Sequence, residues 1–365
     1  MRVIKAEKPG EIDALLQSFE VPTEIEEQVR WHAFFKSARP LTWPRCKSAF
    51  LSVVHGKKIV GCCSVYRYPY PLPFESAWMR RTARTFFWPA NPVNMQGLPV
   101  ISKGNNPEEV YPALLEAIDK LRVRWLAPAI RLIMLDAQND APLIEYLKRA
   151  NYLLEQGIVK NTLEVSWDNF EGYFEKHLRS KTRRLLRKAH KNATGAGVTF
   201  QPLTNPSKEQ DRICELLQNV ADKNKSEVIW SERFLEKEKT YLKERKLVVL
   251  GSYLNGKLIG CTVNFNQGSE FVMKSIGLDY SCSEELNLYR LMLLQGIRYS
   301  IEAGYSTLNA GFSQYAIKRR LGFSQENTLT AVKSWPLAVA PYFAYRSASM
   351  IGETSHQPTK AEGSA

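Results

Sequence analysis

Two stretches of the sequence resemble each other about 200 residues apart: AFLSVVHGKKIVGCCSVYRYP at 49–69 and VVLGSYLNGKLIGCTVNFNQ at 248–267. In each, a β-rich run meets a short turn, and a second β-rich run then passes through a Gly-Cys step. Asn255-Gly256 is a strong hairpin signal because a two-residue turn of this kind needs positive φ at both central positions. The sequence therefore predicts two equivalent β-hairpins.

The segments after each hairpin also repeat in order. The first copy continues with a helix near 108–126, a strand at 130–136 and a helix at 141–150. The second copy continues with a strand at 270–280, a helix near 285–302, a strand at 306–311 and a helix ending in Leu321-Gly322-Phe323. This order predicts an α/β (α+β) fold in which one unit of mixed sheet and flanking helices occurs twice.

The length of 365 residues agrees with two such units. We expect a first domain at 1–165, a second at 166–350 that begins with a basic helix, and a disordered tail at 351–365. No apolar run is long enough to span a membrane and MRVIKAEKPGEID lacks the apolar core of a signal peptide, so we expect a cytoplasmic protein. The six cysteines show no metal-ligand spacing and are expected to be free thiols. The oligomeric state stays open.

A net charge of +13 favours an anionic partner, and the charge is concentrated in one segment. Residues 171–191 hold eight lysines and arginines against two glutamates. A helix over 168–191 would place Arg179, Arg183 and Arg187 on one stripe, with leucines on the other side. The stripe is either a solvated face or a phosphate-binding surface for tRNA, a nucleotide-linked precursor or an anionic lipid headgroup.

The repeated unit resembles the GNAT acyltransferase fold, and its tandem arrangement is similar to the FemAB-like and CelD-like branch of that superfamily. The residues that carry the resemblance are HLRSKTRRLLRKAHKNATGAGVTF at 177–200, YLNGKLIGCTVNF at 253–265, LNLYRLMLLQGIRYSIEAG at 286–304 and LNAGFSQYAIKRRLGF at 308–323. The resemblance implies a tandem GNAT fold and an acyltransferase whose site lies in the second copy.

In that branch the strand before the closing motif commonly ends in Asp and Gly, followed by a Tyr-x-x-Lys step. Here Asn309 stands near the acidic position, and an amide cannot accept a proton as a carboxylate can. The resemblance makes Lys318 and Tyr315 the leading catalytic candidates, with Arg319 beside them as a substrate-binding residue. Lys318 either holds an anionic group of a substrate or lies on a solvated basic turn, and Tyr315 either donates a proton or is structural.

The expected acyl donor depends on the loop that precedes the long helix of each copy. Members of the wider superfamily hold the coenzyme A pyrophosphate with a Gly-rich loop at a helix N-terminus, and neither copy has that spacing. Asp279, Tyr280 and Glu284 precede the helix where the acyl donor approaches in this fold, although Glu284 can simply complement the helix N-terminus. We expect acyl-CoA or aminoacyl-tRNA as a co-substrate, no tightly bound cofactor and no metal site.

The sequence thus predicts an acyl- or aminoacyltransferase that acts on an amine of a cell-envelope precursor, a lipid or a small metabolite. The alternative is a catalytically silent module that keeps the duplicated fold and binds nucleic acid or an anionic membrane surface through the basic segment.

Overall fold

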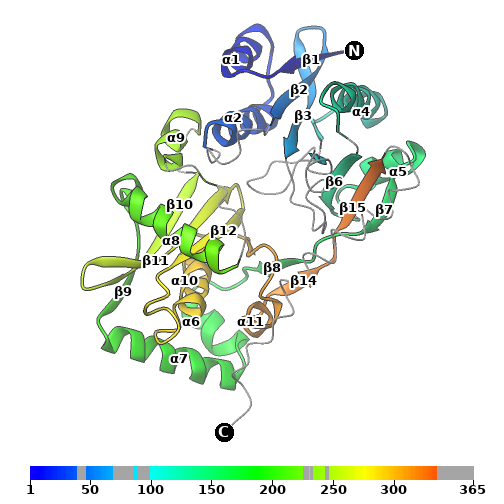
Figure 1. Cartoon of the computed structure of the whole chain (residues 1–365). Coiled ribbons are helices and arrows are strands. Elements are labelled where there is room, and N and C mark those ends of the chain that lie inside the picture. Colours follow the sequence, from blue (N-terminus) through cyan, green and yellow to red (C-terminus); the bar gives the residue numbers. More distant parts are fainter. Residues whose placement is uncertain are drawn as a thin grey trace, which may run out of the picture. The chain divides into compact units, whose positions relative to one another are not determined.

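The computed structural model describes residues 1–38, 47–68, 86–88, 99–127, 129–224, 230, 233–242 and 246–334. These residues form two compact units, each built on one mixed β-sheet (Figure 1). Unit 1 contains residues 1–158 together with the described residues from 327 onward, and unit 2 contains residues 159–326.

The sheet of unit 1 has the strand order β1-β2-β3-β4-β6-β15-β7, with β5 paired to β3. Its strands are β1 (Arg2–Ala6), β2 (Lys47–His55), β3 (Lys58–Tyr68), β4 (Phe86–Trp88), β5 (Val100–Ile101), β6 (Ala129–Leu135), β7 (Leu153–Gln156) and β15 (Leu329–Ser334). Its helices are α1 (Pro9–Ser18), α2 (Thr23–Ala38), α4 (Pro107–Arg124) and α5 (Ala141–Arg149).

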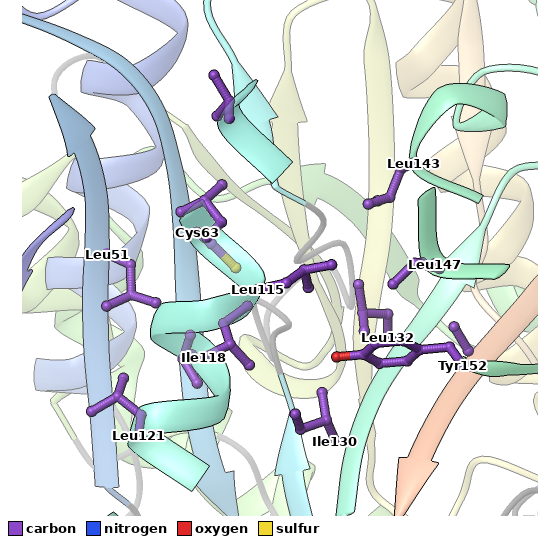
Figure 2. Close-up of a cluster of buried hydrophobic side chains, with 14 of the residues drawn as sticks. Leu51, Cys63, Leu115, Ile118, Leu121, Ile130, Leu132, Leu143, Leu147 and Tyr152 are labelled. Atoms are coloured by element: carbon purple, nitrogen blue, oxygen red, sulfur yellow. The ribbon is translucent and has the colours of Figure 1, made fainter. Parts of the chain in front are cut away.

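Helices cover both faces of this sheet because successive strand residues point to opposite sides. Leu51 and Cys63 belong to a core cluster with α4 and α5, whereas Phe50 and Cys62 belong to a cluster with α1 and α2. Figure 2 shows the first cluster, in which the apolar side chains of α4 lie against the strands.

Unit 2 has the strand order β14-β8-β13-β12-β11-β10-β9. Its strands are β8 (Lys160–Glu164), β9 (Val198–Pro202), β10 (Leu247–Leu254), β11 (Lys257–Gln267), β12 (Glu270–Leu278), β13 (Thr307–Asn309) and β14 (Ser324–Glu326). Its helices are α6 (Phe170–Gly172), a π-helical turn (Tyr173–His177), α7 (Ser180–Gly195), a 3-10 turn (Pro206–Glu209), α8 (Gln210–Lys223), α9 (Phe234–Tyr241), α10 (Leu288–Glu302) and α11 (Tyr315–Arg320).

The two sheets share one topology, which confirms the duplicated fold. From β1 in unit 1 and from β9 in unit 2, the first four strands pair antiparallel, the fourth and fifth pair parallel, and the rest pair antiparallel. Both predicted hairpins form, β2–β3 and β10–β11, and Asn255 and Gly256 have φ values of 51° and 77°.

The units exchange one strand, which sets boundaries other than the expected 165 and 350. β8 follows β7 closely in sequence but pairs with β13 and β14 of unit 2. β15 follows β14 but pairs with β6 and β7 of unit 1. The division therefore falls after Ile158 and again before Asn327, because strand pairing joins segments that are far apart in the chain. The expected tail at 351–365 lies outside the described residues.

The predicted continuous basic helix over 168–191 is wrong. The helical turns from Phe170 end at His177, and α7 begins at Ser180. Leu178 and Arg179 between them are extended, with ψ values of 139° and 145°. Leu178 is buried in the core of unit 2, and its burial fixes the break.

Candidate active site

The parallel strands of unit 2 separate at one point, which marks the candidate site. β12 and β13 pair through Glu270–Thr307, Phe271–Leu308 and Val272–Asn309, and the pairing ends there. β12 then continues to Leu278, while the chain after Asn309 turns into α11. In open α/β sheets, ligands bind at the carboxyl ends of parallel strands where the chain directions diverge.

Asn309 holds the turn that follows β13. It is 5% exposed, and its Oδ1 accepts a hydrogen bond from the Gly311 backbone N–H at 2.9 Å. The side-chain oxygen is thus engaged in shaping the turn, which gives Asn309 a positioning role at the strand end.

The turn itself carries unusual backbone angles. Gly311, Ser313 and Gln314 have φ values of 63°, 71° and 51°. Non-glycine residues in the left-handed region are uncommon, and strained backbone of this kind clusters at functional sites. The turn directs the carbonyl groups of Ala310 and Phe312 toward one side chain of α11.

That side chain is Lys318. It is 3% exposed, and its Nζ donates to the Ala310 carbonyl oxygen at 2.6 Å and to the Phe312 carbonyl oxygen at 3.0 Å. Burial lowers the pKa of Lys318 to about 7. The predicted alternative of a solvated basic turn is wrong for this residue, because α11 turns Lys318 inward.

The bonding of Lys318 leaves one direction open at the nitrogen. A lysine nitrogen has four tetrahedral positions, of which one is Cε and two point at the carbonyl oxygens. No partner occupies the fourth position in the described part of the chain. It holds a lone pair when the amine is neutral and an N–H when it is charged, so Lys318 can accept or donate a proton there.

Tyr315 and Arg319 have different surroundings. The Tyr315 hydroxyl donates to the Val159 carbonyl oxygen at 3.1 Å, and burial raises its pKa. Its only proton is therefore used to fasten α11 to the start of unit 2. Arg319 is exposed to solvent on α11, next to Lys318 in sequence but on the outer side.

Asp279, Tyr280 and Glu284 belong to a separate network that joins the end of β12 to α8. Asp279 Oδ2 lies 2.6 Å from Arg212 Nη2, and hydrogen bonds from Ser281 and Arg212 lower the pKa of Asp279 to about 2. Lys223 Nζ lies 2.7 Å from Glu284 Oε1 and 3.9 Å from the centre of the Tyr280 ring. These contacts give the three residues structural partners.

The three predicted arginines of the basic segment have different surroundings. Arg183 Nη1 donates to the carbonyl oxygens of Glu175 and Leu178 at 2.7 Å and 2.6 Å, so it closes the break before α7. Arg187 pairs with the Glu175 carboxylate and lies over the Phe174 ring. Arg179 is exposed at the start of α7. Arg183 and Arg187 thus share one face of α7 and both contact Glu175, whereas Arg179 lies just before the helix.

A second stripe of basic side chains on α7 is exposed to solvent. Lys181, Arg184, Lys188 and Lys191 are exposed and lie opposite the buried Leu186, Ala189 and Ala193. None of the four side chains has a hydrogen bond or ion pair to another described residue, and α7 contains no acidic residue. This face is a further candidate surface for an anionic partner.

Sequence reasoning missed one residue, Lys274, which lies in β12 just beyond the last pair with β13. Met273 pairs with Asn264 and Ser275 pairs with Val263, so Lys274 is the extra residue of a β-bulge. Burial lowers its pKa to about 8. The signal in the sequence was a single lysine inside the otherwise uncharged run FVMKSIGL.

The fold has known counterparts among solved structures. FemX superposes with a TM-score of 0.58 at 12% identity, covering 91% of this chain and 97% of that one. L-PGS from Bacillus licheniformis gives 0.52 at 11% identity, covering 95% and 98%. A tandem GNAT protein from the clavulanic acid biosynthesis pathway gives 0.50 at 12% identity, covering 91% and 98%. The fold is thus that of the tandem GNAT proteins.

The sequence places the chain more narrowly within this class. The FemAB-like family model, described as peptidoglycan biosynthesis/recognition, matches residues 86–346. Because the match spans more than half of the chain, the protein belongs to the FemAB-like family. Family and fold together identify it as an acyltransferase. A comparison with curated proteins finds no significant sequence match.

Two kinds of feature are absent from the described residues. None of their helices has the length and apolar character needed to cross a membrane. No group of three or more His, Cys, Asp or Glu side chains among them is arranged to hold a metal ion.

Proposed function

We propose that the protein transfers an aminoacyl group from aminoacyl-tRNA to an amine of a cell-envelope precursor or lipid, at the point in unit 2 where β12 and β13 separate. The observation that carries the proposal is the bonding of Lys318, a buried amine with two fixed carbonyl acceptors and one open direction. Its pKa of about 7 suits proton transfer at neutral pH.

In the proposed reaction, Lys318 takes up one proton and then returns it. The acceptor amine attacks the carbonyl carbon of the donor ester, and a carbon–nitrogen bond forms. Neutral Lys318 takes the proton that the nitrogen loses, and the resulting ammonium lies beside the negative oxygen of the tetrahedral intermediate. When the bond from carbon to the leaving oxygen breaks, Lys318 returns the proton to that oxygen. The acceptor gains the acyl group and the enzyme ends unchanged.

The choice of donor rests on the turn between β12 and α10. A pyrophosphate needs free backbone N–H groups at a helix N-terminus. Here the amides of Leu286, Asn287 and Leu288 donate to the carbonyl oxygens of Cys282, Glu284 and Ser283 at 3.1, 3.2 and 2.9 Å. The exposed carboxylate of Glu284 lies in the same turn, where it pairs with Lys223. The missing Gly-rich spacing and the pairing of these three amides support the ester of a charged tRNA as the donor in preference to coenzyme A.

The names of the solved counterparts support the choice of acceptor. One of them is described as the C-terminal domain of a putative lysylphosphatidylglycerol synthetase, with a TM-score of 0.51 at 13% identity. The family description names peptidoglycan. Both point to acceptors of the cell envelope, and the free basic face of α7 suits an anionic substrate such as tRNA or an anionic lipid surface.

The test is a transfer assay with two donors and two acceptors. The full chain is incubated with tRNA charged with labelled amino acids or with labelled acetyl-CoA, and with either an amine-bearing peptidoglycan precursor or vesicles of phosphatidylethanolamine, a lipid whose headgroup carries an amine. We expect transfer from charged tRNA, and a fall of at least a hundredfold in kcat for Lys318→Met. The matched control is Lys208→Met, an exposed lysine of the same unit.

Three results contradict the proposal. Transfer from acetyl-CoA alone overturns the donor. Transfer from neither donor, with the chain folded, overturns the enzymatic function and favours the silent binding module. A Lys318→Met variant with full kcat removes Lys318 from the reaction.

A further inference from the structure

The bulge in β12 puts two neighbouring side chains on one face of the sheet. Met273 packs in the core cluster of Leu293, Leu294 and Ile297, which belong to α10. Ile276 packs against the core cluster that contains Leu288 and Leu291 of the same helix. Because regular strands alternate faces, the two residues between them, Lys274 and Ser275, are left for the opposite face.

Contacts of the neighbouring residues identify that face as the side of α8 and α9. Ser275 Oγ accepts a hydrogen bond from Trp230 Nε1 at 3.1 Å, and the Trp230 ring stacks on Phe234 of α9 at 4.8 Å. A side chain at Gly277 would meet Leu216 of α8. Lys318 instead belongs to α11, whose Ile317 packs in the α10 cluster. The two lysines therefore approach the strand ends from opposite faces of the sheet.

Lys274 and Ser275 both have hydrogen-bond donors that no described residue accepts. No hydrogen bond or ion pair joins Lys274 to any described residue, and burial alone accounts for its lowered pKa. The Ser275 oxygen accepts from Trp230, and no described residue accepts the proton of the Ser275 hydroxyl. Lys274 is half-buried, and an ammonium that is partly withdrawn from water is stabilised by a compensating charge. An anionic oxygen would satisfy both groups.

We propose that Lys274 and Ser275 form an anion subsite that holds a phosphate or carboxylate group of the acceptor on the α8–α9 face, opposite Lys318. This inference rests on the proposed function for the identity of its ligand as the acceptor. The subsite aligns the acceptor so that its amine reaches the acyl carbon at the strand ends. Lys274 is then a binding residue, and Lys318 keeps the proton transfer.

The subsite can be tested without turnover. The wild-type chain is treated with trace acetic anhydride at pH 8, alone or with inorganic pyrophosphate or acetate, and acetylation of each lysine is read by mass spectrometry. Pyrophosphate represents a phosphate ligand and acetate a carboxylate ligand. We expect the better anion to slow acetylation of Lys274 at least tenfold, while exposed Lys208 in the same sample stays within twofold.

A variant of Ser275 provides the second part of the test. Ser275→Ala should raise the anion concentration for half-protection of Lys274 at least threefold, because one donor is removed. A Lys274 acetylation rate that neither anion changes overturns the subsite and leaves the proposed function intact. Protection of Lys274 in a protein that shows no transfer from either donor keeps the anion subsite and overturns the proposed function.

In the transfer assay, Lys274→Met separates binding from chemistry. We expect the acceptor KM to rise at least tenfold with kcat within twofold, whereas Lys318→Met lowers kcat. A fall in kcat with unchanged KM for Lys274→Met contradicts a binding role.

Discussion

Lys318 Nζ lies 2.6 Å from the carbonyl oxygen of Ala310, the residue that follows β13. This bond spans the left-handed turn through Gly311, Ser313 and Gln314, so the lysine holds the turn while the turn fixes the lysine. The arrangement orients the nitrogen and leaves one of its positions free, which links the local backbone directly to the proposed chemistry.

The buried lysine makes folding stability depend on pH. The folded-state pKa of Lys318 is about 7, against an ordinary value of 10.5. Between these values the unfolded chain binds more protons than the folded chain, so this residue makes stability rise as the pH increases from 7. We expect the Lys318→Met variant to lose this rise. Urea unfolding of both proteins from pH 6 to 9.5 measures it, and parallel curves would contradict a lowered pKa.

Asp279 should matter for stability and not for transfer. Its carboxylate joins Arg212 of α8 to the end of β12 and is 15% exposed. Asp279→Asn should cost about 1–3 kcal/mol at pH 7. The wild-type advantage is present above the ordinary pKa of 3.8 and is lost as the pH falls toward about 2.

Urea unfolding at pH 7 and pH 3 checks this prediction. The exposed control is Glu284→Gln, whose unfolding midpoint should stay close to that of the wild type because a solvated ion pair contributes little. If Asp279→Asn keeps its stability but loses transfer activity, Asp279 is instead a substrate-binding residue.

Gly322 should not tolerate a side chain. It has a φ of 88°, and a methyl group there would overlap with His177 Nε2. Gly322→Ala should lower stability by about 1–3 kcal/mol from backbone strain and the clash together. The double variant with His177→Ala should recover the steric part only. Thermal unfolding of the set measures both parts, and full recovery would show that the backbone angle contributes nothing.

The exposed stripe of α7 should bind anions without supporting the fold. Replacing Lys181, Arg184, Lys188 and Lys191 with glutamine should weaken binding of tRNA and reduce its salt dependence, by roughly 0.9 in log–log slope for each duplex phosphate that the protein no longer neutralises. Arg183→Gln should instead destabilise unit 2, since Arg183 bonds two backbone carbonyls at the break before α7.

Filter binding of tRNA from 50 to 300 mM salt, with urea unfolding of the same variants, separates the two effects. Unchanged tRNA affinity in the quadruple variant, together with loss of binding to phosphatidylglycerol vesicles, would assign the face to lipid.

Local sequence determined much of this protein. The Asn255-Gly256 turn and the β-rich runs around it predicted a hairpin that the structure contains, because turn type and strand alternation depend on neighbouring residues. The repeated order of elements predicted the duplication for the same reason. The charge of residues 171–191 was also readable, since it is a matter of composition.

Only the tertiary structure decided the strand exchange, the inward position of Lys318 and the bulge at Lys274. Each depends on contacts between residues distant in the chain. Pairing of β8 with β13 cannot be read from either strand, and the burial of Lys318 depends on how α11 meets the end of β13. A sequence fixes which side chains are present, but burial and orientation, which set a pKa and an open bonding direction, arise only when the distant segments pack.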